Sequence, residues 1–187
     1  MELLAPAGGM EQLRAAVAFG ADAVYLAAER FGMRARAANF RMDEIPAAVA
    51  FAHEHGVKVH VTCNILMHPD DIDGLPAFFR ALDAAGVDAF IIGDLGAFAV
   101  AGEASVANAA AARVWHSLGA SRVVCAREMS LADIARLRQE APPDLEIEAF
   151  AHGAMCMAVS GRCLISSYLT GRSGNKGACT QPCRWNY

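Results

Sequence analysis

The stretch "FGADAVYL", residues 19–26, carries the pattern that decides the fold. Three later stretches resemble it: "HGVKVHVT" (55–62), "AGVDAFII" (85–92) and "LGASRVVC" (118–125). Each contains a glycine, then one or two small or polar residues, then an apolar run of residues that favour β-strands. The stretches recur at intervals of about 30 to 36 residues, which indicates a repeated structural unit.

An alanine-rich amphipathic segment precedes each glycine. These segments are "MEQLRAAVAFG", "DEIPAAVAFAHEHG", "LPAFFRALDAAG" and "NAAAARVWHSLG". A helix that ends at a glycine and leads into a short buried strand is half of a βαβ unit. Two further strands fit this scheme, "ELLAPA" (2–7) and "LEIEAF" (145–150). The repeat therefore predicts an α/β fold, a TIM-like (β/α) barrel with parallel strands, with a doubly wound sheet as the alternative.

The length sets a limit on this barrel. A complete eight-stranded barrel takes about 250 residues, whereas this chain has 187 and shows about six strands. We therefore expect an incomplete barrel. Residues 1–150 should form the repeat domain, and residues 151–187 should form a Cys- and Gly-rich, cluster-binding segment packed on it.

Composition narrows the class of protein. The chain is 55% hydrophobic and 19% charged, which excludes disorder. No apolar run reaches the length of a transmembrane helix, and the N-terminus does not resemble a signal peptide, so we expect a cytoplasmic protein without membrane contact. The net charge is −4, so contact with nucleic acid would require a local basic patch.

Six cysteines fall into two groups. Cys63 and Cys125 lie in apolar strands and are predicted to be core residues. The other four, in a glycine-rich region, are Cys156, Cys163, Cys179 and Cys183. Clustered thiols in a cytosolic protein usually bind metal or react. The closely spaced pair Cys179 and Cys183 suits zinc, whereas the widely spaced pair Cys156 and Cys163 suits an iron–sulfur cluster. A catalytic thiol and inert buried thiols are further alternatives.

Polar residues follow several predicted strands, where (β/α) barrels place their active sites. The candidates for proton transfer or substrate hydrogen bonds are His152, Asn64, Asp94 and Glu128. The candidates for binding an anionic substrate are Arg34, Arg36 and Asn39, since arginine suits carboxylate and phosphate. Each could equally be a structural cap or a solvated surface residue. Tyr25 and His60 lie within strands and are expected to pack.

The stretch "EAFAHGAMCMAVSGRCLIS" (148–166) resembles the signature of peptidase family U32. That signature reads Glu-x-Phe-x-x-Gly-Ala-aliphatic-Cys-x4-Gly-x-Cys-x-aliphatic-Ser. Further blocks that look like the family are "LLAPAGG", "GADAVYL", "RARAANF", "VTCNIL", "SVANAAAARVW" and "GACTQPCRW". The resemblance therefore extends over nearly the whole chain.

The resemblance implies a function and a cofactor. The family was named for collagenase-like protease activity, but members similar to it are associated with oxygen-independent hydroxylation of tRNA, rRNA or a ubiquinone precursor. It implies prephenate as a small anionic co-substrate of the RNA-directed members. It also implies a [4Fe-4S] cluster, with Cys156, Cys163 and Cys179 as ligands and Cys183 or a later cysteine as the fourth.

The chain departs from the family pattern before Ser105. Members usually have a strand there, whereas "LGAFAVAGEASVANAAAA" leads from one helical stretch to the next. We therefore expect this strand to be missing and sheet closure to be affected. Two alternatives to RNA hydroxylation stay open. One is a U32 peptidase, although the sequence has no HExxH or GxSxG motif; the other is a non-catalytic, metal-stabilised partner subunit in an oligomer.

Overall fold

In the computed structural model, the repeat forms two parallel sheets. The structure describes residues 1–33, 39–101, 104–106, 109–153, 156–158 and 163–186. The first sheet has the order β1 (Leu4–Pro6), β2 (Ala23–Ala27), β3 (Lys58–Cys63), β4 (Ala89–Ile92). The second has the order β5 (Ala104–Val106), β6 (Arg122–Cys125), β7 (Glu146–Glu148). Strand order follows chain order in both sheets, as in a (β/α) barrel, and the predicted α/β fold is confirmed.

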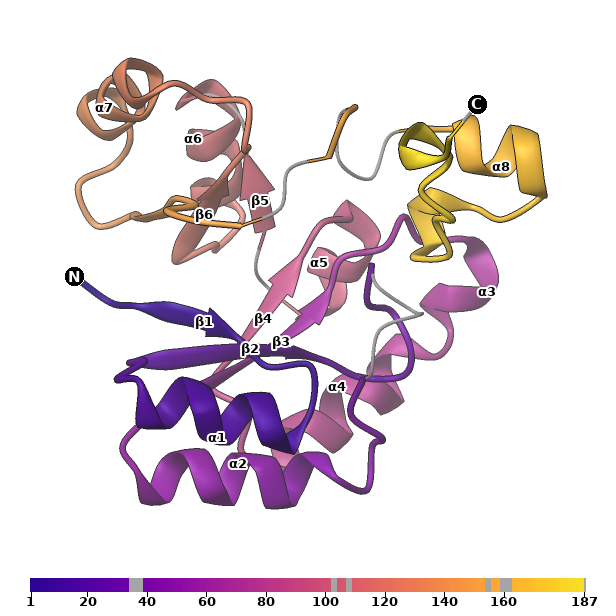
Figure 1. Ribbon diagram of the computed structural model, residues 1–187. Coiled ribbons are helices and arrows are strands. Elements are labelled where there is room, and N and C mark those ends of the chain that lie inside the picture. The colour runs from indigo at the N-terminus through magenta and orange to yellow at the C-terminus, as the bar shows by residue number, and fades with distance from the viewer. Residues whose placement is uncertain (34–38, 102–103, 107–108, 154–155, 159–162, 187) are drawn as a thin grey trace.

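Helices alternate with the strands. The four alanine-rich segments form α1 (Met10–Ala18), α2 (Ile45–Glu54), α4 (Leu75–Ala84) and α6 (Ala109–Ser117). The remaining helices are α3 (Pro69–Ile72), α5 (Leu95–Ala101), α7 (Leu131–Glu140) and α8 (Ile165–Thr170), with two 3₁₀ turns, η1 (Gly174–Lys176) and η2 (Pro182–Arg184). Helices α1 and α2 cover one face of the first sheet, and α6 and α7 lie beside the second (Figure 1).

The repeated glycines end their helices in the same way. Gly20, Gly56, Gly86 and Gly119 all have a positive φ, between 72° and 109°. At Gly56, its N–H donates to the His53 carbonyl at 3.0 Å and the next N–H, of Val57, donates to Ala52 at 3.0 Å. This pair of bonds is a Schellman motif, which requires a left-handed residue and turns the chain into the following strand.

Replacing Gly56 should test this requirement. Gly56→Ala should lower the free energy of unfolding by about 1 kcal/mol, because open space surrounds the residue and only the left-handed backbone is strained. Gly56→Asn should lower it by less, since Asn tolerates this conformation better. Urea unfolding of both variants measures the difference. Equal stability of the two variants and the wild type would contradict the assignment.

The main core lies between the first sheet and its helices. Alternate residues of β3, Val59, Val61 and Cys63, are fully buried against this layer. A second cluster lies between the second sheet and α6 and α7, and it contains Cys125. The prediction that Cys63 and Cys125 are core residues is confirmed. Burial raises the pKa of the Cys63 thiol to about 12, so this group stays protonated.

The other face of the first sheet is more polar. Tyr25 pairs in register with His60, and Ala27 pairs with Thr62. His60 and Thr62 are buried, whereas Tyr25 is half-buried. Burial lowers the pKa of His60, which favours the neutral imidazole. The expectation that His60 packs within its strand is confirmed.

The expectation that the strand before Ser105 is missing is wrong. Strand β5, Ala104–Val106, pairs in parallel with β6 and aligns Ser105 with Val124. It has only three residues and begins three positions after α5 ends at Ala101. A strand this short in an alanine-rich stretch gives almost no β signal in the sequence. β4 and β5 are in contact, but in the described part of the chain no hydrogen-bonded ladder joins them.

Arg122 connects the two sheets by ion pairs. Its guanidinium lies 2.7 Å from the Glu2 carboxylate next to β1, 2.6 Å from Glu146 and 3.7 Å from Glu148 in β7. Lys58 of β3 approaches Glu2 at 3.1 Å. The hydrogen bond from Arg122 lowers the pKa of Glu2 from 4.5 to about 2. One arginine thus holds together strands that no ladder joins.

The ion pair between Arg122 and Glu2 should make the free energy of unfolding depend on pH. Glu2→Gln should unfold more easily than the wild type at pH 7, and the difference should shrink as the pH falls from 4.5 toward about 2. A carboxyl group whose pKa is lower in the folded than in the unfolded state stabilises the fold at pH values above its unfolded pKa. This stabilisation is lost as the pH falls through the folded pKa. Urea unfolding across this pH range measures it. The exposed Glu54→Gln serves as control, and a parallel pH profile of the two variants would contradict the prediction.

Candidate functional site

The end of β3 is held by Asn64. Its side-chain Oδ1 accepts a hydrogen bond from the Met33 N–H at 3.0 Å, and its own N–H donates to the Phe31 carbonyl at 2.9 Å. Gly93 lies so close that a Cβ there would stand 3.2 Å from the Asn64 carbonyl oxygen. Asn64 therefore ties the loop after β2 to the loop after β3. This supports the structural alternative, and a catalytic role stays a prediction.

Asp94 plays a similar part after β4. Its Oδ1 accepts hydrogen bonds from the N–H groups of Gly96 at 2.8 Å and Ala97 at 3.2 Å. Its Oδ2 accepts from the Met67 N–H at 3.3 Å. The carboxylate thus caps α5 and ties it to the loop after β3. Asn64 and Asp94 therefore build the rim of the sheet by holding backbone.

The remaining strand-end candidates are placed differently. Glu128 and His152 are both exposed, and Asn39 is half-buried. Arg34 and Arg36 lie outside the described residues. These roles in catalysis and substrate binding stay predictions.

One charged residue at this rim was missed by the sequence reasoning. Arg127 follows β6, and its guanidinium lies 3.7 Å from the centre of the Phe150 ring, a cation–π contact. The backbone of Gly153 passes close to it, since a Cβ there would lie 3.3 Å from Arg127 Nη1. The strand-end rule that selected Glu128 applies equally to its neighbour Arg127.

The backbone of Cys163 and the side chain of Cys179 both lie close to Gly174. A Cβ on Gly174 would lie 3.5 Å from the Cys163 carbonyl oxygen and 3.8 Å from the Cys179 Sγ. The Cys179 sulfur accepts a hydrogen bond from the Gln181 N–H at 3.4 Å. Backbone N–H groups directed at cysteine sulfur are a feature that tunes iron–sulfur sites. This turn therefore presents a thiol in a setting that suits metal ligation.

Three of the four cysteines, Cys156, Cys179 and Cys183, are exposed, and Cys163 is half-buried. Cys156 and Cys183 are both free, and all four cysteines of this region are unbridged. The described residues contain no group of three His, Cys, Asp or Glu side chains close enough to share one metal ion. The donor chemistry fits a thiolate-bound metal centre, and the fold brings the Cys163 backbone and the Cys179 side chain to the same glycine, Gly174.

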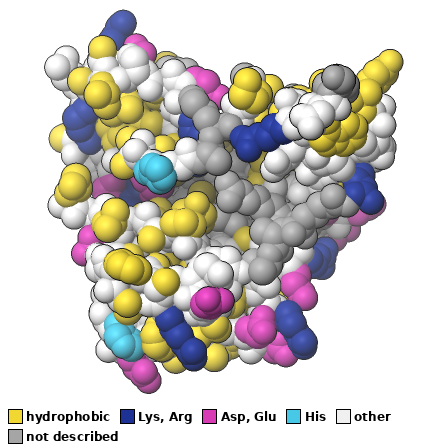
Figure 2. Space-filling view, viewed as in Figure 1, with side chains coloured by type: hydrophobic (Ala, Val, Ile, Leu, Met, Phe, Trp, Pro, Cys, Tyr) yellow, Lys and Arg dark blue, Asp and Glu magenta, His cyan; other side chains and the backbone are white. Residues whose placement is uncertain are grey.

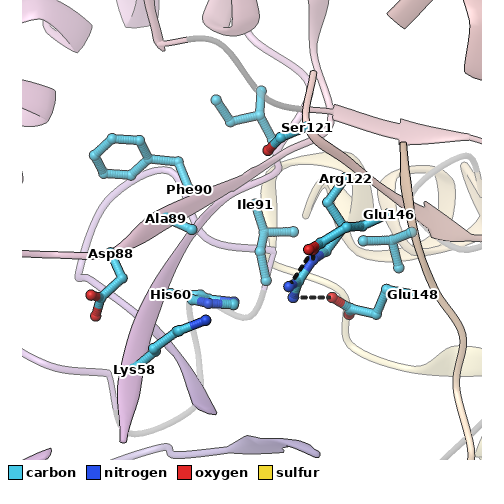
Figure 3. A pocket seen from close by; sticks show the side chains of 12 residues that line it. Lys58, His60, Asp88, Ala89, Phe90, Ile91, Ser121, Arg122, Glu146 and Glu148 are labelled. Carbon is cyan, nitrogen blue, oxygen red and sulfur yellow. Dashed lines mark hydrogen bonds and ion pairs between the residues drawn. The ribbon is translucent and has the colours of Figure 1, made fainter. Parts of the chain in front are cut away.

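A cavity of about 310 Å³ opens at the other end of the strands. Its walls include Lys58, His60, Arg122, Glu146 and Glu148 (Figure 3). In the close-up, Arg122 points toward both glutamates. Arg122 and Lys58, which both pair with Glu2, lie in these walls. In (β/α) barrels this end contributes stability and the opposite end contributes chemistry, so the strand carboxyl ends are the better candidate site.

The chain belongs to peptidase family U32, because the family model matches residues 8–187. It is 41% identical over 198 positions to tRNA hydroxylation protein P1 of Bacillus subtilis, covering 100% of this chain and 46% of that protein. It is 37% identical over 196 positions to the 23S rRNA 5-hydroxycytidine C2501 synthase of Escherichia coli, covering 100% of this chain and 30% of the synthase. The chain thus spans less than half the length of these relatives.

A solved structure supports the fold. The U32 peptidase Mk0906 superposes with a TM-score of 0.66 at 14% sequence identity, over 80% of this chain and 68% of that one. No helix among the described residues is long and apolar enough to cross a membrane.

The structural interpretation of Asp94 predicts a graded effect. Asp94→Ala should lower the free energy of unfolding by about 1 to 2 kcal/mol, because α5 loses its cap. Asp94→Asn should cost less, since its amide oxygen still accepts from Gly96 and Ala97. Thermal and urea unfolding measure both variants. An Asp94→Ala protein as stable as the wild type would contradict this interpretation.

Proposed function

We propose that this chain forms part of a U32 protein that hydroxylates RNA without molecular oxygen, on a tRNA or rRNA nucleotide. The proposal is supported by relatives named for tRNA hydroxylation and for 5-hydroxycytidine synthesis, each of which aligns with the whole chain. The single structural observation that carries it is the turn at Gly174, where the Cys179 side chain lies near the Cys163 backbone and the Gln181 N–H is directed at Cys179 Sγ.

The cysteines would hold a [4Fe-4S] cluster. Cys163 and Cys179 would be the first pair of ligands, with Cys156 and Cys183 completing the set. When bound, such a cluster supplies a redox-active or Lewis-acidic iron site. The chain's own contribution is to position it: Ser166 Oγ accepts from the Thr180 N–H at 3.0 Å and donates to the Arg172 carbonyl at 2.8 Å, which fixes the turn that carries Cys179.

The rim at the carboxyl ends of the strands would receive the substrates. Arg127 follows β6, and Arg34 and Arg36 follow β2 in the sequence; these cations would bind RNA phosphate or a small dicarboxylate such as prephenate. Asn64 and Asp94 would keep the rim rigid through their backbone hydrogen bonds. The exposed His152 and Glu128 would be free to contact substrate or transfer protons.

Metal analysis after anaerobic purification tests the cofactor. We expect about four irons and four sulfides per chain. Cys163→Ala and Cys179→Ala should each lose most of this iron, whereas Cys63→Ala should keep it because Cys63 is buried in the core. Stoichiometric zinc without sulfide would contradict the cluster. The same thiols would then form a zinc site, which the peptidase or the partner-subunit alternative could use.

Mass spectrometry of nucleosides tests the activity. Deleting the gene should abolish one hydroxylated nucleoside, a uridine in tRNA or a cytidine in 23S rRNA, and restoring the full-length gene should return it. Unchanged nucleosides would contradict the proposal. Cleavage of a collagen-type substrate by the purified protein would then favour the peptidase alternative.

A further inference from the structure

The C-terminal part of the chain has a charge distribution unlike the rest. No Asp or Glu follows Glu148, while four basic residues do: Arg162, Arg172, Lys176 and Arg184. The whole chain nevertheless carries a net charge of −4. The positive excess is therefore concentrated in the cysteine-bearing segment, and a strong charge asymmetry of this kind points to a polyanionic partner.

Residues 163–186 form a tightly bonded unit, here called the terminal unit. Within it, Ser166 and Thr170 from α8 contact Thr180 through their hydroxyls, at 3.2 and 3.5 Å. The unit is also attached to the barrel. The Asn175 carbonyl accepts from the Leu66 N–H at 3.1 Å, and Lys176 pairs with Asp71 at 2.9 Å. Groups on this unit are therefore held next to the loop after β3.

Two aromatic rings stand out from the terminal unit. Tyr168 is 87% exposed and Trp185 is 46% exposed. The Trp185 ring is oriented, because its Nε1–H donates to the Thr180 carbonyl at 3.2 Å. Hydrophobic side chains gather over this part of the molecule, at the upper right of Figure 2. Exposed rings on a segment whose charged residues are all basic suit a ligand with both charge and flat apolar faces.

Single-stranded RNA has both properties. Its phosphates pair with arginine and lysine, and its bases stack on aromatic rings. We propose that the terminal unit is the RNA-binding surface of this protein, with Tyr168 and Trp185 stacking on unpaired bases and Arg172 and Arg184 contacting the backbone. This inference rests on the proposed function for the class of substrate. It adds the surface and the unpaired state of the RNA.

Fluorescence anisotropy with a labelled RNA stem-loop tests the surface. Tyr168→Ala and Trp185→Ala should each raise the Kd about tenfold. Arg172→Glu should weaken binding and reduce the dependence of log Kd on log salt concentration by about one. The matched controls are Phe19→Ala, whose ring is 90% exposed at the end of α1, and Arg80→Glu on α4. Both controls should bind like the wild type, and unfolding curves show that each variant is folded.

The outcomes separate this surface from the proposed function. If all variants of the terminal unit bind RNA as the controls do, the surface is wrong even when the cells still make the hydroxylated nucleoside. If the aromatic variants lose RNA but gene deletion changes no nucleoside, the surface stands and the proposed activity fails. If the variants change only the oligomeric state in light scattering, the rings belong to a protein interface, and the RNA surface is overturned.

Discussion

The ion pairs of Arg122 are the interaction on which the arrangement of the two sheets depends. Hydrogen-bonded ladders hold β1 to β4 and β5 to β7, but in the described residues none spans β4 and β5. Arg122 reaches Glu2 beside β1 and Glu146 in β7, so charge brings together the outer strands of both sheets. The side chains of Arg122 and Glu2 are partly buried, and an unpaired charge at that place would destabilise the fold. The ion pairs lie at the amino ends of the strands, and the loops and the cysteine-bearing turn lie at the opposite rim.

That rim is built from backbone bonds. Asn64 ties two loops together, and Asp94 joins α5 to the loop after β3. The terminal unit then attaches to the same region through Asn175 and the Lys176–Asp71 pair. The segment that carries Cys163 and Cys179 is thus attached to the loop after β3. A metal centre and an RNA surface on one unit would give the reacting nucleotide a short path to the cofactor, which is how this arrangement serves the proposed function.

The sequence predicts the local elements of this fold much better than its long-range contacts. The turns at Gly56 and its three counterparts can be recognised in the sequence, because the helix end, the turn and the strand follow one another within a few residues. Strand β5 was not predicted because three residues are too few to show a periodic pattern. Helix α3 was not predicted for the same reason, since it is a single turn. The pairing of Arg122 with Glu2 joins residues 120 positions apart, so no local pattern could reveal it. Likewise, the roles of Asn64 and Asp94 depend on which backbone N–H groups the fold brings near, whereas Cys63 could be placed in the core from its apolar neighbours alone.

The most direct test of the central claim links the thiols to the RNA product. Cells that lack the gene would receive the full-length gene with Cys163→Ala, Cys179→Ala or Cys63→Ala, and their tRNA and rRNA nucleosides would be measured by mass spectrometry. The account predicts that Cys63→Ala restores the hydroxylated nucleoside while the two other variants, present at equal protein levels, do not. Full restoration by Cys163→Ala and Cys179→Ala would contradict it, because the thiols of these two cysteines would then have no part in RNA hydroxylation.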